Sequence, residues 1–328
     1  MEKVLFDNRK NNNEISVVIP IYNGEKLISN LLKELADQTF KKFETVIVDD
    51  GSFDRSLEQI FNNLTLLENI CVIYKKNEGA GLARNIGIKY CYGDYLIFLD
   101  CDDHFESSLL EELYNSIKIN KSDMAICDAK ELDVKNNKIV NSDCFLRKKI
   151  IKEEKFISPM NYNSLIFYIS CAAPWNKLIK KELIDKNQIR FQNTHNSNDL
   201  SFVCKCIVSA QKICFTRKKL IMYSVGGENN LSGSYDKFPV DICYALLELK
   251  KYMLNKKCFS NYKFSFYSLA FEHIFYHYFR MFKKKSKIEL TKKIISTGFF
   301  GILLYPTLCF RKRKSLKKLL ILLITNLF

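Results

Sequence analysis

The hydrophobic pattern of the first 128 residues alternates between short apolar runs and longer amphipathic segments. The short runs are rich in β-branched and aromatic residues, which is typical of buried strands. The predicted strands cover residues 15–20, 44–50, 70–76, 95–100 and 123–128. The segments between them place apolar residues at helical spacing. The predicted helices cover residues 25–38, 56–64, 81–91 and 107–118.

Strands that are apolar throughout and that alternate with helices predict an α/β fold with a mostly parallel sheet, covered on both faces. Right-handed crossovers place the carboxyl ends of such strands along one edge, where these sheets bind ligands. Four polar loops follow successive strands, and we therefore expect them to meet at that edge. In the sequence these loops read IPIYNG, VDDGS, KNEGAG and DCDD.

The rest of the chain has a less regular pattern. Residues 1–13 are polar and are predicted to form a flexible tail, and residues 129–165 are lysine-rich without an assigned element. The expected later elements are a helix that begins near Pro174 within residues 171–191, a helix over 198–212, strands within 213–225 and aromatic-rich helices over 240–282.

The loop after the fourth strand carries three carboxylates within four positions, Asp100, Asp102 and Asp103. Like charges this close repel one another unless something positive lies among them. A calcium loop is disfavoured, because Phe105 stands where its sharp turn needs glycine. The dipole of the following helix favours nearby acids, but it does not explain why Asp100 ends a buried strand. A divalent cation that joins one or two carboxylates to a diphosphate fits the pattern best.

Charge is distributed unevenly along the chain, whose formal net charge is +15. Residues 1–120 carry a net charge of −7, whereas residues 280–328 carry +12. The acidic part suits a metal or nucleotide site, and the basic, apolar end suits an anionic membrane rather than nucleic acid. Residues 294–310 are uncharged, but 17 residues are fewer than the roughly 20 that a span needs. We expect peripheral attachment to the inner face of the cell membrane, with packing or oligomerisation, or a true span, as the alternatives.

Twelve cysteines are scattered along the chain without a CxxC pair. The N-terminus is polar and does not resemble a signal peptide. These features predict reduced thiols in a cytoplasmic protein, most of them small core residues.

Six motifs occur in order within residues 14–235. They read SVVIPIYNG, FETVIVDDGSFDRS, NEGAGLARNIGI, GDYLIFLDCDD, WNKLIKKELI and NDLSF. Together they resemble glycosyltransferase family 2. The resemblance implies a GT-A fold, an αβα sandwich that binds a nucleotide sugar, and an inverting, usually metal-dependent sugar transfer. Bacterial relatives commonly build surface glycans.

This resemblance also implies how the chain is divided. Residues 14–128 are the expected nucleotide-sugar-binding half, and residues 129–235 the acceptor-binding half. Residues 236–328 are expected to form a helical C-terminal region that is basic and apolar and ends in a membrane-associating tail.

Roles in nucleotide binding are implied for residues of the first three loops. Asp50 corresponds to the acid that hydrogen-bonds the uracil imide, with Asp49 as a support for its loop. A carboxylate in this place is selective, because a wrong base leaves it unpaired. The other residues implied to lie at the nucleotide or donor are Pro20, Tyr22, Asn23, Gly79, Arg84 and Asn85. Rim packing by Tyr22 and an ion pair between Arg84 and the acidic loop are the structural alternatives.

The metal and the base come from separate segments. Asp102 is the first expected metal ligand, Asp100 contacts metal or ribose, and Asp103 supports the loop or contacts the donor sugar. Asp199 is the expected general base, since an inverting displacement removes the acceptor proton opposite the leaving diphosphate. The family usually has Glu-Asp here, whereas this chain has Asn198 before Asp199. Helix capping by Asp199, or a base at His195, is the alternative.

Two expected acceptor contacts are Trp175 and Asn198. Trp175 is the only tryptophan and could stack on a sugar or anchor the core. Ser232 could match a serine that the family carries in a mobile loop, although its partner arginine is not found. His273 and His277 are four residues apart without a glutamate, and they predict helix packing rather than a metal site.

The predicted function is inverting transfer of a sugar from a UDP-sugar to a glycan or lipid-linked acceptor, with Mn²⁺ or Mg²⁺ as cofactor. One alternative is a membrane-associated nucleotide- or glycan-binding protein without turnover, because the Glu-Asp and arginine-serine features are degraded. Another is a nucleotidyltransferase, which would need a Gly-rich loop with Arg or Lys after the first strand. The sequence IPIYNGEKL does not provide that loop.

Overall fold

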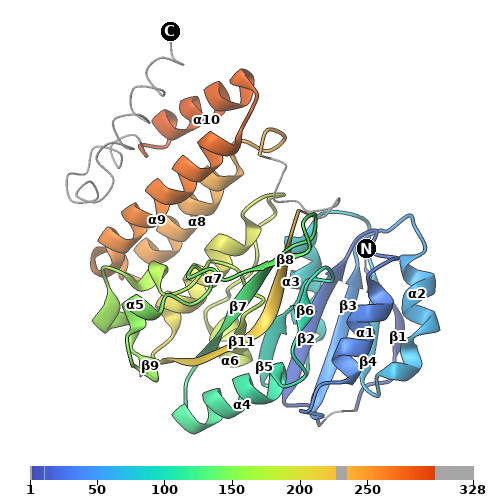
Figure 1. The fold of residues 1–328 in the computed structure, drawn as a ribbon. Helices are drawn as coiled ribbons and strands as arrows, with labels where there is room; N and C mark the ends of the chain where they lie inside the picture. Colours follow the sequence, from blue (N-terminus) through green and yellow to red (C-terminus); the bar gives the residue numbers. More distant parts are fainter. Residues whose placement is uncertain (1, 11, 227–234, 300–328) are drawn as a thin grey trace.

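The computed structural model describes residues 2–10, 12–226 and 235–299. Its strands are β1 (Lys3–Asp7), β2 (Ile15–Ile21), β3 (Phe43–Asp49), β4 (Ile70–Tyr74), β5 (Tyr95–Phe98), β6 (His104–Phe105), β7 (Met124–Asp133), β8 (Lys138–Val140), β9 (Phe156–Ile157), β10 (Lys177–Lys180) and β11 (Ile213–Val225). They form one sheet with the order β1-β4-β3-β2-β5-β10-β7-β11-β6, while β8 pairs with β7 and β9 with β11 (Figure 1).

The α-helices are α1 (Ile28–Ala36), α2 (Ser56–Asn62), α3 (Ala80–Tyr90), α4 (Leu109–Asn120), α5 (Lys148–Ile151), α6 (Lys181–Lys186), α7 (Asn198–Ser209), α8 (Asp241–Asn255), α9 (Phe259–Arg280) and α10 (Lys284–Ser296). Short 3₁₀ turns cover Leu64–Leu66, Pro159–Tyr162 and Ile166–Tyr168. One buried cluster joins α1, α2 and α4 to one face of the sheet, and a second joins α3, α6 and α7 to the other. The predicted αβα sandwich is therefore confirmed.

The parallel part of the sheet lies where the pattern predicts it. Strands β4, β3, β2 and β5 are parallel neighbours, and β7 is parallel to β11. Between these groups, β10 pairs antiparallel with both β5 and β7. The carboxyl ends of β2, β3, β4, β5, β7 and β11 consequently share one edge, which places the polar loops together.

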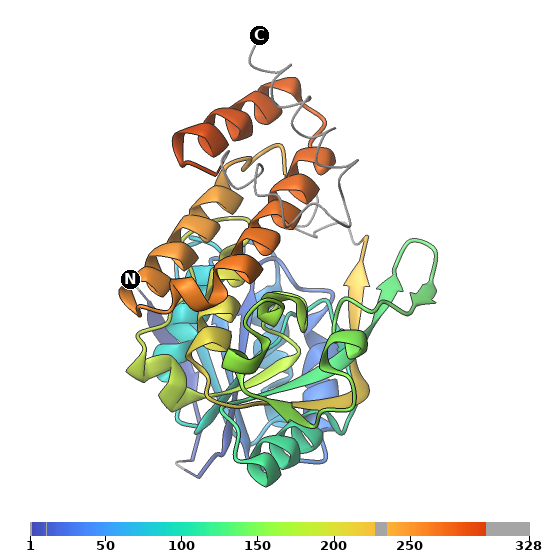
Figure 2. The same cartoon turned by 90° about the vertical axis from the view of Figure 1, so that its left-hand side faces the viewer.

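The C-terminal helices form an additional layer on the α3–α7 side of the sandwich. Helices α8 and α9 share the buried cluster of α7, and α10 contributes Leu290 and Ile294 to it. Figures 1 and 2 show the three helices standing to one side of the sheet. Because burial of a leucine or isoleucine stabilises a fold by about 1.5–3 kcal/mol, α10 is an integral part of this layer.

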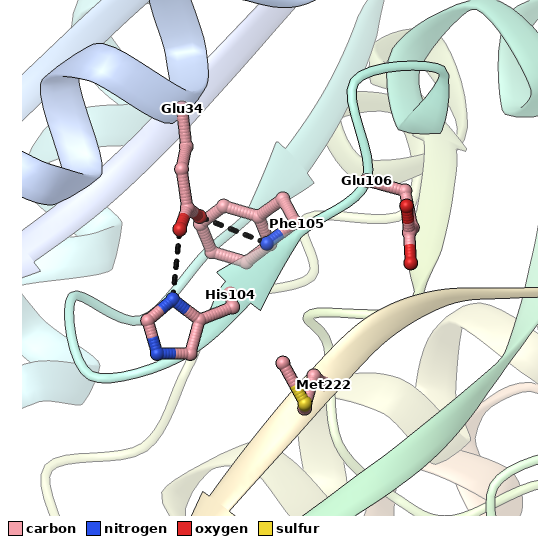
Figure 3. A pocket seen from close by; sticks show the side chains of 5 residues that line it. All are labelled: Glu34, His104, Phe105, Glu106 and Met222. Carbon is pink, nitrogen blue, oxygen red and sulfur yellow. Dashed lines mark hydrogen bonds and ion pairs between the residues drawn. The ribbon is translucent and has the colours of Figure 1, made fainter.

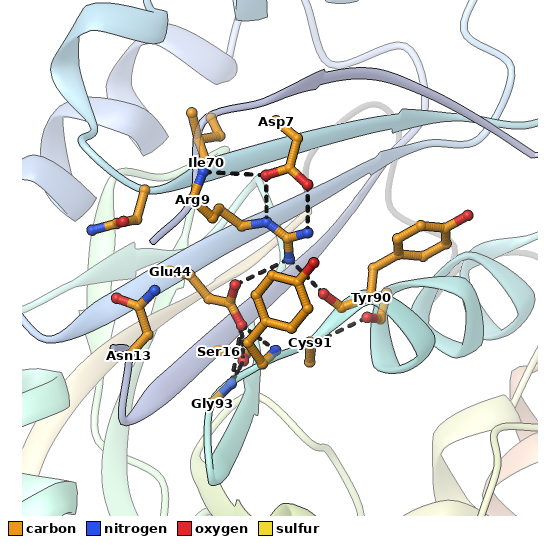
Figure 4. Close-up of polar contacts among 12 residues, drawn as sticks. Asp7, Arg9, Asn13, Ser16, Glu44, Ile70, Tyr90, Cys91 and Gly93 are labelled. Carbon is orange, nitrogen blue, oxygen red and sulfur yellow. Dashed lines mark hydrogen bonds and ion pairs between the residues drawn. The ribbon is translucent and has the colours of Figure 1, made fainter. Parts of the chain in front are cut away.

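The prediction of a flexible tail over residues 1–13 was wrong for most of that segment. Residues Lys3–Asp7 form β1, which pairs antiparallel with β4 at the edge of the sheet. Beyond this strand, Arg9 lies buried against Glu44, with a distance of 3.0 Å between Nη1 and Oε2 (Figure 4). Polar composition misled the prediction, because the segment is held by backbone pairing and one buried ion pair.

The helix predicted to begin near Pro174 was also placed wrongly. The chain instead forms the strand β10, and the helix α6 starts only at Lys181. Three of the four residues of β10 are buried in succession and give no periodic signal, so that the downstream helical pattern dominated the prediction.

Two expectations concern the C-terminal region and the cysteines. Residues 300–328 lie outside the described residues, and with them most of the predicted membrane-associating tail. Among the helices of the described residues, none combines the length and the apolar character required to cross a bilayer. The eleven cysteines of the described residues are all free thiols.

Candidate active site

Arg84 of α3 places a positive charge beside the acidic loop. Its Nη2 lies 2.5 Å from Oδ1 of Asp100, directly after β5. Its Nη1 donates to Oδ1 of Asn198 at 3.2 Å, at the start of α7. Arg84 is only 6% exposed, so that this side chain joins the acidic loop to the segment that carries Asp199.

Arg84 does not neutralise the whole loop. Burial, followed by the negative charge of Asp100, raises the pKa of Asp102 to about 6. Burial, followed by the negative charges of Asp100 and Asp102, raises the pKa of Asp103 well above its ordinary value. Asp103 is 2% exposed and accepts the backbone N–H of Ser224 at 2.9 Å, but its Oδ2 has no hydrogen-bond partner.

These features fit a divalent cation. The unpartnered, buried oxygen of Asp103 beside Asp100 and Asp102 is a carboxylate oxygen, the type of ligand that Mg²⁺ and Mn²⁺ prefer. Within the described part of the chain, no group of three or more His, Cys, Asp or Glu side chains is placed to hold a metal ion by itself. Such cations commonly take one or two carboxylates and complete their shell with phosphate oxygens and water.

The acidic loop is neither a calcium-binding helix–loop–helix nor a cluster held by a helix dipole. Asp100 follows a strand, and β6 separates Asp103 from α4, so the segment lacks the two flanking helices of a calcium loop. Helix α4 begins at Leu109, too far from Asp103 for its dipole to stabilise that charge, since the effect falls off within one turn.

Asp50, directly after β3, binds the loop that precedes α3. Its Oδ1 accepts Lys75 Nζ at 2.6 Å and the N–H of Glu78 at 3.0 Å, and its Oδ2 accepts the N–H of Gly79 at 2.7 Å. Gly79 has φ +98°, a conformation that favours glycine. Asp50 therefore holds the loop before α3 in place.

The neighbouring acid, Asp49, has one oxygen without a partner. Its Oδ1 accepts the Ser52 hydroxyl at 2.5 Å, whereas Oδ2 is buried and makes no hydrogen bond. Burial raises the pKa of Asp49. The role of Asp50 at the uracil imide remains a prediction, and Asp49 lies next to it with a free acceptor.

The loop after β2 is tied to the loop after β3. The Oδ1 of Asn23 accepts the N–H of Phe53 at 3.0 Å, and the N–H of Asn23 donates to the Ser52 hydroxyl at 2.9 Å. Tyr22 is 48% exposed and meets Phe53 edge-on. Pro20 lies in β2 and is half-buried. These residues form a rim with an exposed aromatic ring, and their contact with the nucleotide stays a prediction.

Helix α3 approaches the segment before α7 closely. The side chain of Asn85 bonds both backbone groups of Phe191, at 2.8 Å and 2.9 Å. A Cβ atom on Gly81 would lie 2.5 Å from the carbonyl oxygen of Gln192. Both residues therefore set the position of this segment, and the amide of Asn85 is already engaged.

Asp199 lies in the first turn of α7 and is half-buried. Burial raises its pKa, while the nearby charge of Arg84 lowers it and that of Asp100 raises it again. The proposed base thus lies within electrostatic range of the acidic loop. The preceding Asn198, 8% exposed, is bonded to Arg84 rather than open to an acceptor.

The prediction that Trp175 contacts the acceptor is not supported by its position. Trp175 is 3% exposed and stacks on Tyr223, with ring centroids 5.2 Å apart, so its faces are covered. Tyr223 directly precedes Ser224, whose N–H binds Asp103, and burial followed by the charges of Asp103 and Asp100 raises the pKa of Tyr223. Trp175 is a core anchor that supports a ring next to the site.

Sequence reasoning missed Lys177, which is fully buried at the start of β10. Its Nζ donates to the carbonyl oxygens of Cys171 and Ala173, at 2.9 Å and 2.8 Å. Burial lowers its pKa. The sequence shows this residue only as the lysine of the motif WNKL. A lysine in that motif does not indicate that its ammonium group is buried in the core.

A polar stripe binds the chain just after the acidic loop, and it is formed by Asn30 and Glu34 of α1 and by Gln38 just beyond the end of that helix. Oε1 of Glu34 lies 2.7 Å from Nδ1 of His104, and its Oε2 accepts the N–H of Phe105 at 2.9 Å (Figure 3). Gln38 donates to the carbonyl oxygen of Glu106 at 3.0 Å. The acidic loop is thereby fixed to a rigid helix.

His273 and His277 behave as predicted, as packing residues of α9. Both pKa values are lowered by burial, to about 4 and about 3. Ser232 lies outside the described residues. The lid-loop prediction attached to it stays a prediction.

Comparison with known proteins agrees with this geometry. The family model Glycosyl transferase family 2 matches residues 16–187. The chain is 31% identical over 209 residues to a cholesterol galactosyltransferase of Borreliella burgdorferi, covering 62% of this chain and 57% of that relative. It is 29% identical over 239 residues to glycosyltransferase GlyG of Streptococcus pneumoniae, covering 70% of this chain and 75% of GlyG.

A solved structure shows the same fold. S. aureus TarS 1-349 in complex with UDP-GlcNAc superimposes with a TM-score of 0.63 at 21% identity, covering 93% of this chain and 88% of TarS 1-349. The fold, the match over more than half of the chain and the polar edge agree with one another. The chain belongs to glycosyltransferase family 2.

Proposed function

We propose that the chain transfers a sugar from a UDP-sugar to a glycan or lipid-linked acceptor of the bacterial surface, with inversion at the anomeric carbon. The observation that carries this proposal is the bridge made by Arg84, which bonds Asp100 at 2.5 Å and Asn198 at 3.2 Å. Through this bridge the acidic loop and the turn of Asp199 share one edge of the sheet. The TarS complex with UDP-GlcNAc supports a UDP-sugar as the donor.

In this proposal Asp102 and Asp100 would hold a divalent cation, which would supply positive charge against the leaving diphosphate. Asp103 is held by the N–H of Ser224 and keeps the loop in shape. Asp199 accepts the proton of the acceptor hydroxyl as that oxygen attacks the anomeric carbon. The raised pKa of Asp199 makes it a stronger base than an exposed aspartate.

Attachment to the inner face of the membrane belongs to the same proposal. Phe282 is 91% exposed between α9 and α10, and Lys283, Lys284 and Lys285 follow it on the surface. Exposed aromatic rings beside lysines suit an anionic lipid interface. A membrane-binding surface of this kind would bring the chain close to lipid-linked acceptors.

The test is turnover by the purified full-length chain with Mn²⁺ and a panel of UDP-sugars, measured as UDP release with and without bacterial membranes as the acceptor source. We expect release that depends on the membranes for at least one UDP-sugar. Asp199→Asn should abolish this release and keep the affinity for UDP, measured by calorimetry, because the base does not contact the nucleotide.

Two outcomes would contradict the proposal. Loss of UDP binding in Asp199→Asn would remove the base assignment, since Asp199 would then be part of the nucleotide site. Tight UDP binding without release from any UDP-sugar would favour the binding protein without turnover. The nucleotidyltransferase alternative does not agree with the family of the chain.

A further inference from the structure

The turn before Asp199 is bound by the C-terminal helices. The backbone N–H groups of His195 and Asn196 both donate to Oδ2 of Asp241, each at 2.9 Å. Asp241 is the first residue of α8 and is 8% exposed. A buried carboxylate that accepts two backbone donors fixes the path of the chain at that point, because charge-assisted hydrogen bonds are roughly twice as strong as neutral ones.

Further contacts from the C-terminal region meet the same turn. The hydroxyl of Ser197 lies 3.4 Å from Nε2 of His277 in α9, and the ring of His195 stacks at 3.9 Å on Phe238, which precedes α8. The side chain of Gln192 donates to the carbonyl oxygen of Tyr244 in α8 at 3.2 Å. The C-terminal region therefore contacts this turn at several points between Gln192 and Ser197.

The turn itself has an unusual backbone. Ser197 has φ +57°, a left-handed conformation that non-glycine residues adopt at a cost unless their surroundings hold them. Helix α7 begins directly after it and makes no side-chain cap with this serine. The contacts from Asp241 and His277 supply the support that the turn lacks within its own segment.

Asp241 is not explained as a cap of its own helix. The cap position of α8 is Val240, and no side-chain cap hydrogen bond forms there. The carboxylate is instead directed at a segment 45 residues earlier in the chain. These hydrogen bonds between residues far apart in the sequence hold the start of α8 against the turn before α7.

We propose that Asp241 is a positioning residue for the reaction, and that α8 and α9 hold the turn that aims Asp199 at the acidic loop. This inference rests on the proposed function, since it assumes that Asp199 is the base. Helices α8 and α9 then support the active site in addition to forming an outer layer of the molecule. Displacement of a catalytic group by about 1 Å can lower a rate by about a hundredfold, so the support has a measurable effect.

The experiment compares Asp241→Ala and Asp241→Asn in the full-length chain. Asp236→Ala is the matched control, because Asp236 also accepts two backbone N–H groups at 2.9 Å, those of Phe282 and Lys283, away from the turn. We measure kcat, KM for the UDP-sugar, UDP affinity and thermal unfolding. All rates are taken well below the unfolding temperature of each variant.

We expect Asp241→Ala to lower kcat by about tenfold to a hundredfold, with UDP affinity and KM for the donor unchanged. Asp241→Asn keeps an acceptor oxygen and should recover most of that rate, while Asp236→Ala should keep the kcat of the unchanged chain. A fold-supporting role alone would lower the unfolding temperature of both alanine variants and leave kcat unchanged.

Equal kcat in Asp241→Ala and Asp236→Ala would overturn the inference. If Asp241→Ala lowers UDP affinity as strongly as kcat, the turn serves the nucleotide site and the inference is also wrong. Failure of the proposed base would be recognised by a different measurement. Asp199→Asn would then retain transfer, whatever the kcat of Asp241→Ala.

Discussion

Adjacent carboxylates in this site have different surroundings, and these decide what each can do. Asp50 accepts one lysine and two backbone N–H groups, so both its oxygens are engaged by the protein. Asp49 and Asp103 each keep a buried oxygen without a partner. A free buried acceptor costs roughly 1–3 kcal/mol, which a ligand can recover by binding there.

The sequence located these acids but could not assign their partners. The motif VDDGS predicts two carboxylates at a strand end, yet which of them meets Lys75 depends on how the loop before α3 turns. Lys75 lies 25 residues from Asp50 in the sequence. Likewise, Trp175 could not be assigned to core or ligand until Tyr223 was found against its face.

The pH dependence of transfer tests the surroundings of Asp199. Since burial raises its pKa, the base takes up a proton at a higher pH than an exposed aspartate does. We therefore expect kcat at saturating UDP-sugar and Mn²⁺ to fall with decreasing pH, along a limb that lies above the ordinary value of about 4.

Saturating Mn²⁺ matters in this measurement because Asp102, with a pKa of about 6, affects metal binding in the same range. UDP affinity measured over the same pH values is the control. A limb at or below the ordinary aspartate value would contradict the burial of the base.

At the scale of elements, α1 acts as the support of the acidic loop. Its apolar face buries Ile28, Leu31, Leu32 and Leu35, while Asn30 and Glu34, with Gln38 just after the helix, recur every four residues along a polar stripe. The sequence predicted the apolar face by its spacing. In the sequence the polar stripe resembles an ordinary solvent-exposed face. Its neighbour β6 could not be predicted, because a strand of two residues has no detectable pattern.

Removal of Glu34 should loosen the loop that holds the cation. We expect Glu34→Ala to raise the Mn²⁺ concentration at half-maximal rate by about tenfold or more, since residues that support metal ligands commonly contribute 10- to 100-fold in affinity. Glu34→Gln keeps an acceptor for the N–H of Phe105 and should have a smaller effect.

The matched control is Glu58→Ala on the neighbouring helix α2, where Glu58 is exposed. Its half-maximal Mn²⁺ concentration should equal that of the unchanged chain. The same value for Glu34→Ala would show that the stripe is not part of the metal site.

At the scale of the whole molecule, the N-terminal segment is fastened into the sandwich by Arg9. Its guanidinium pairs with Asp7 at 2.7 Å and Glu44 at 3.0 Å, and it also donates to the carbonyl oxygen of Tyr90 (Figure 4). Glu44 is fully buried and also accepts the N–H groups of Tyr92 and Gly93. This network connects the N-terminal segment to β3 and to the turn before β5.

Breaking this network should destabilise the fold. Arg9→Met leaves the buried charge of Glu44 without its cation, and we expect a loss of about 3 kcal/mol in the free energy of unfolding. Chemical denaturation measures it. Lys89→Met removes an exposed ion pair with Glu2 and should leave stability unchanged, whereas equal effects of both variants would contradict the buried network.

The structure refines how membrane attachment should be tested. Removal of residues 284–328 would delete α10 and expose the core that Leu290 and Ile294 complete. Truncation after Phe299, which leaves α10 in place, is the better variant, and we expect it to weaken sedimentation with anionic vesicles.

Replacement of Lys283, Lys284 and Lys285 by Gln should weaken binding further, by about a hundredfold at about 1 kcal/mol for each lysine near an anionic surface. The control replaces the exposed Lys135, Lys138 and Lys149, which lie on other elements. Unchanged sedimentation of the truncated chain would show that the tail does not attach it.

The absence of a side chain at position 81 sets the distance between α3 and the segment that leads to Asp199. Any side chain there would collide with the backbone at Gln192, because a Cβ would lie 2.5 Å from that carbonyl oxygen. Helix α3 and this segment are thus in contact at the glycine, with no room to move closer. Their separation is consequently fixed by the packing of main chain on main chain, and larger residues at position 81 would widen it.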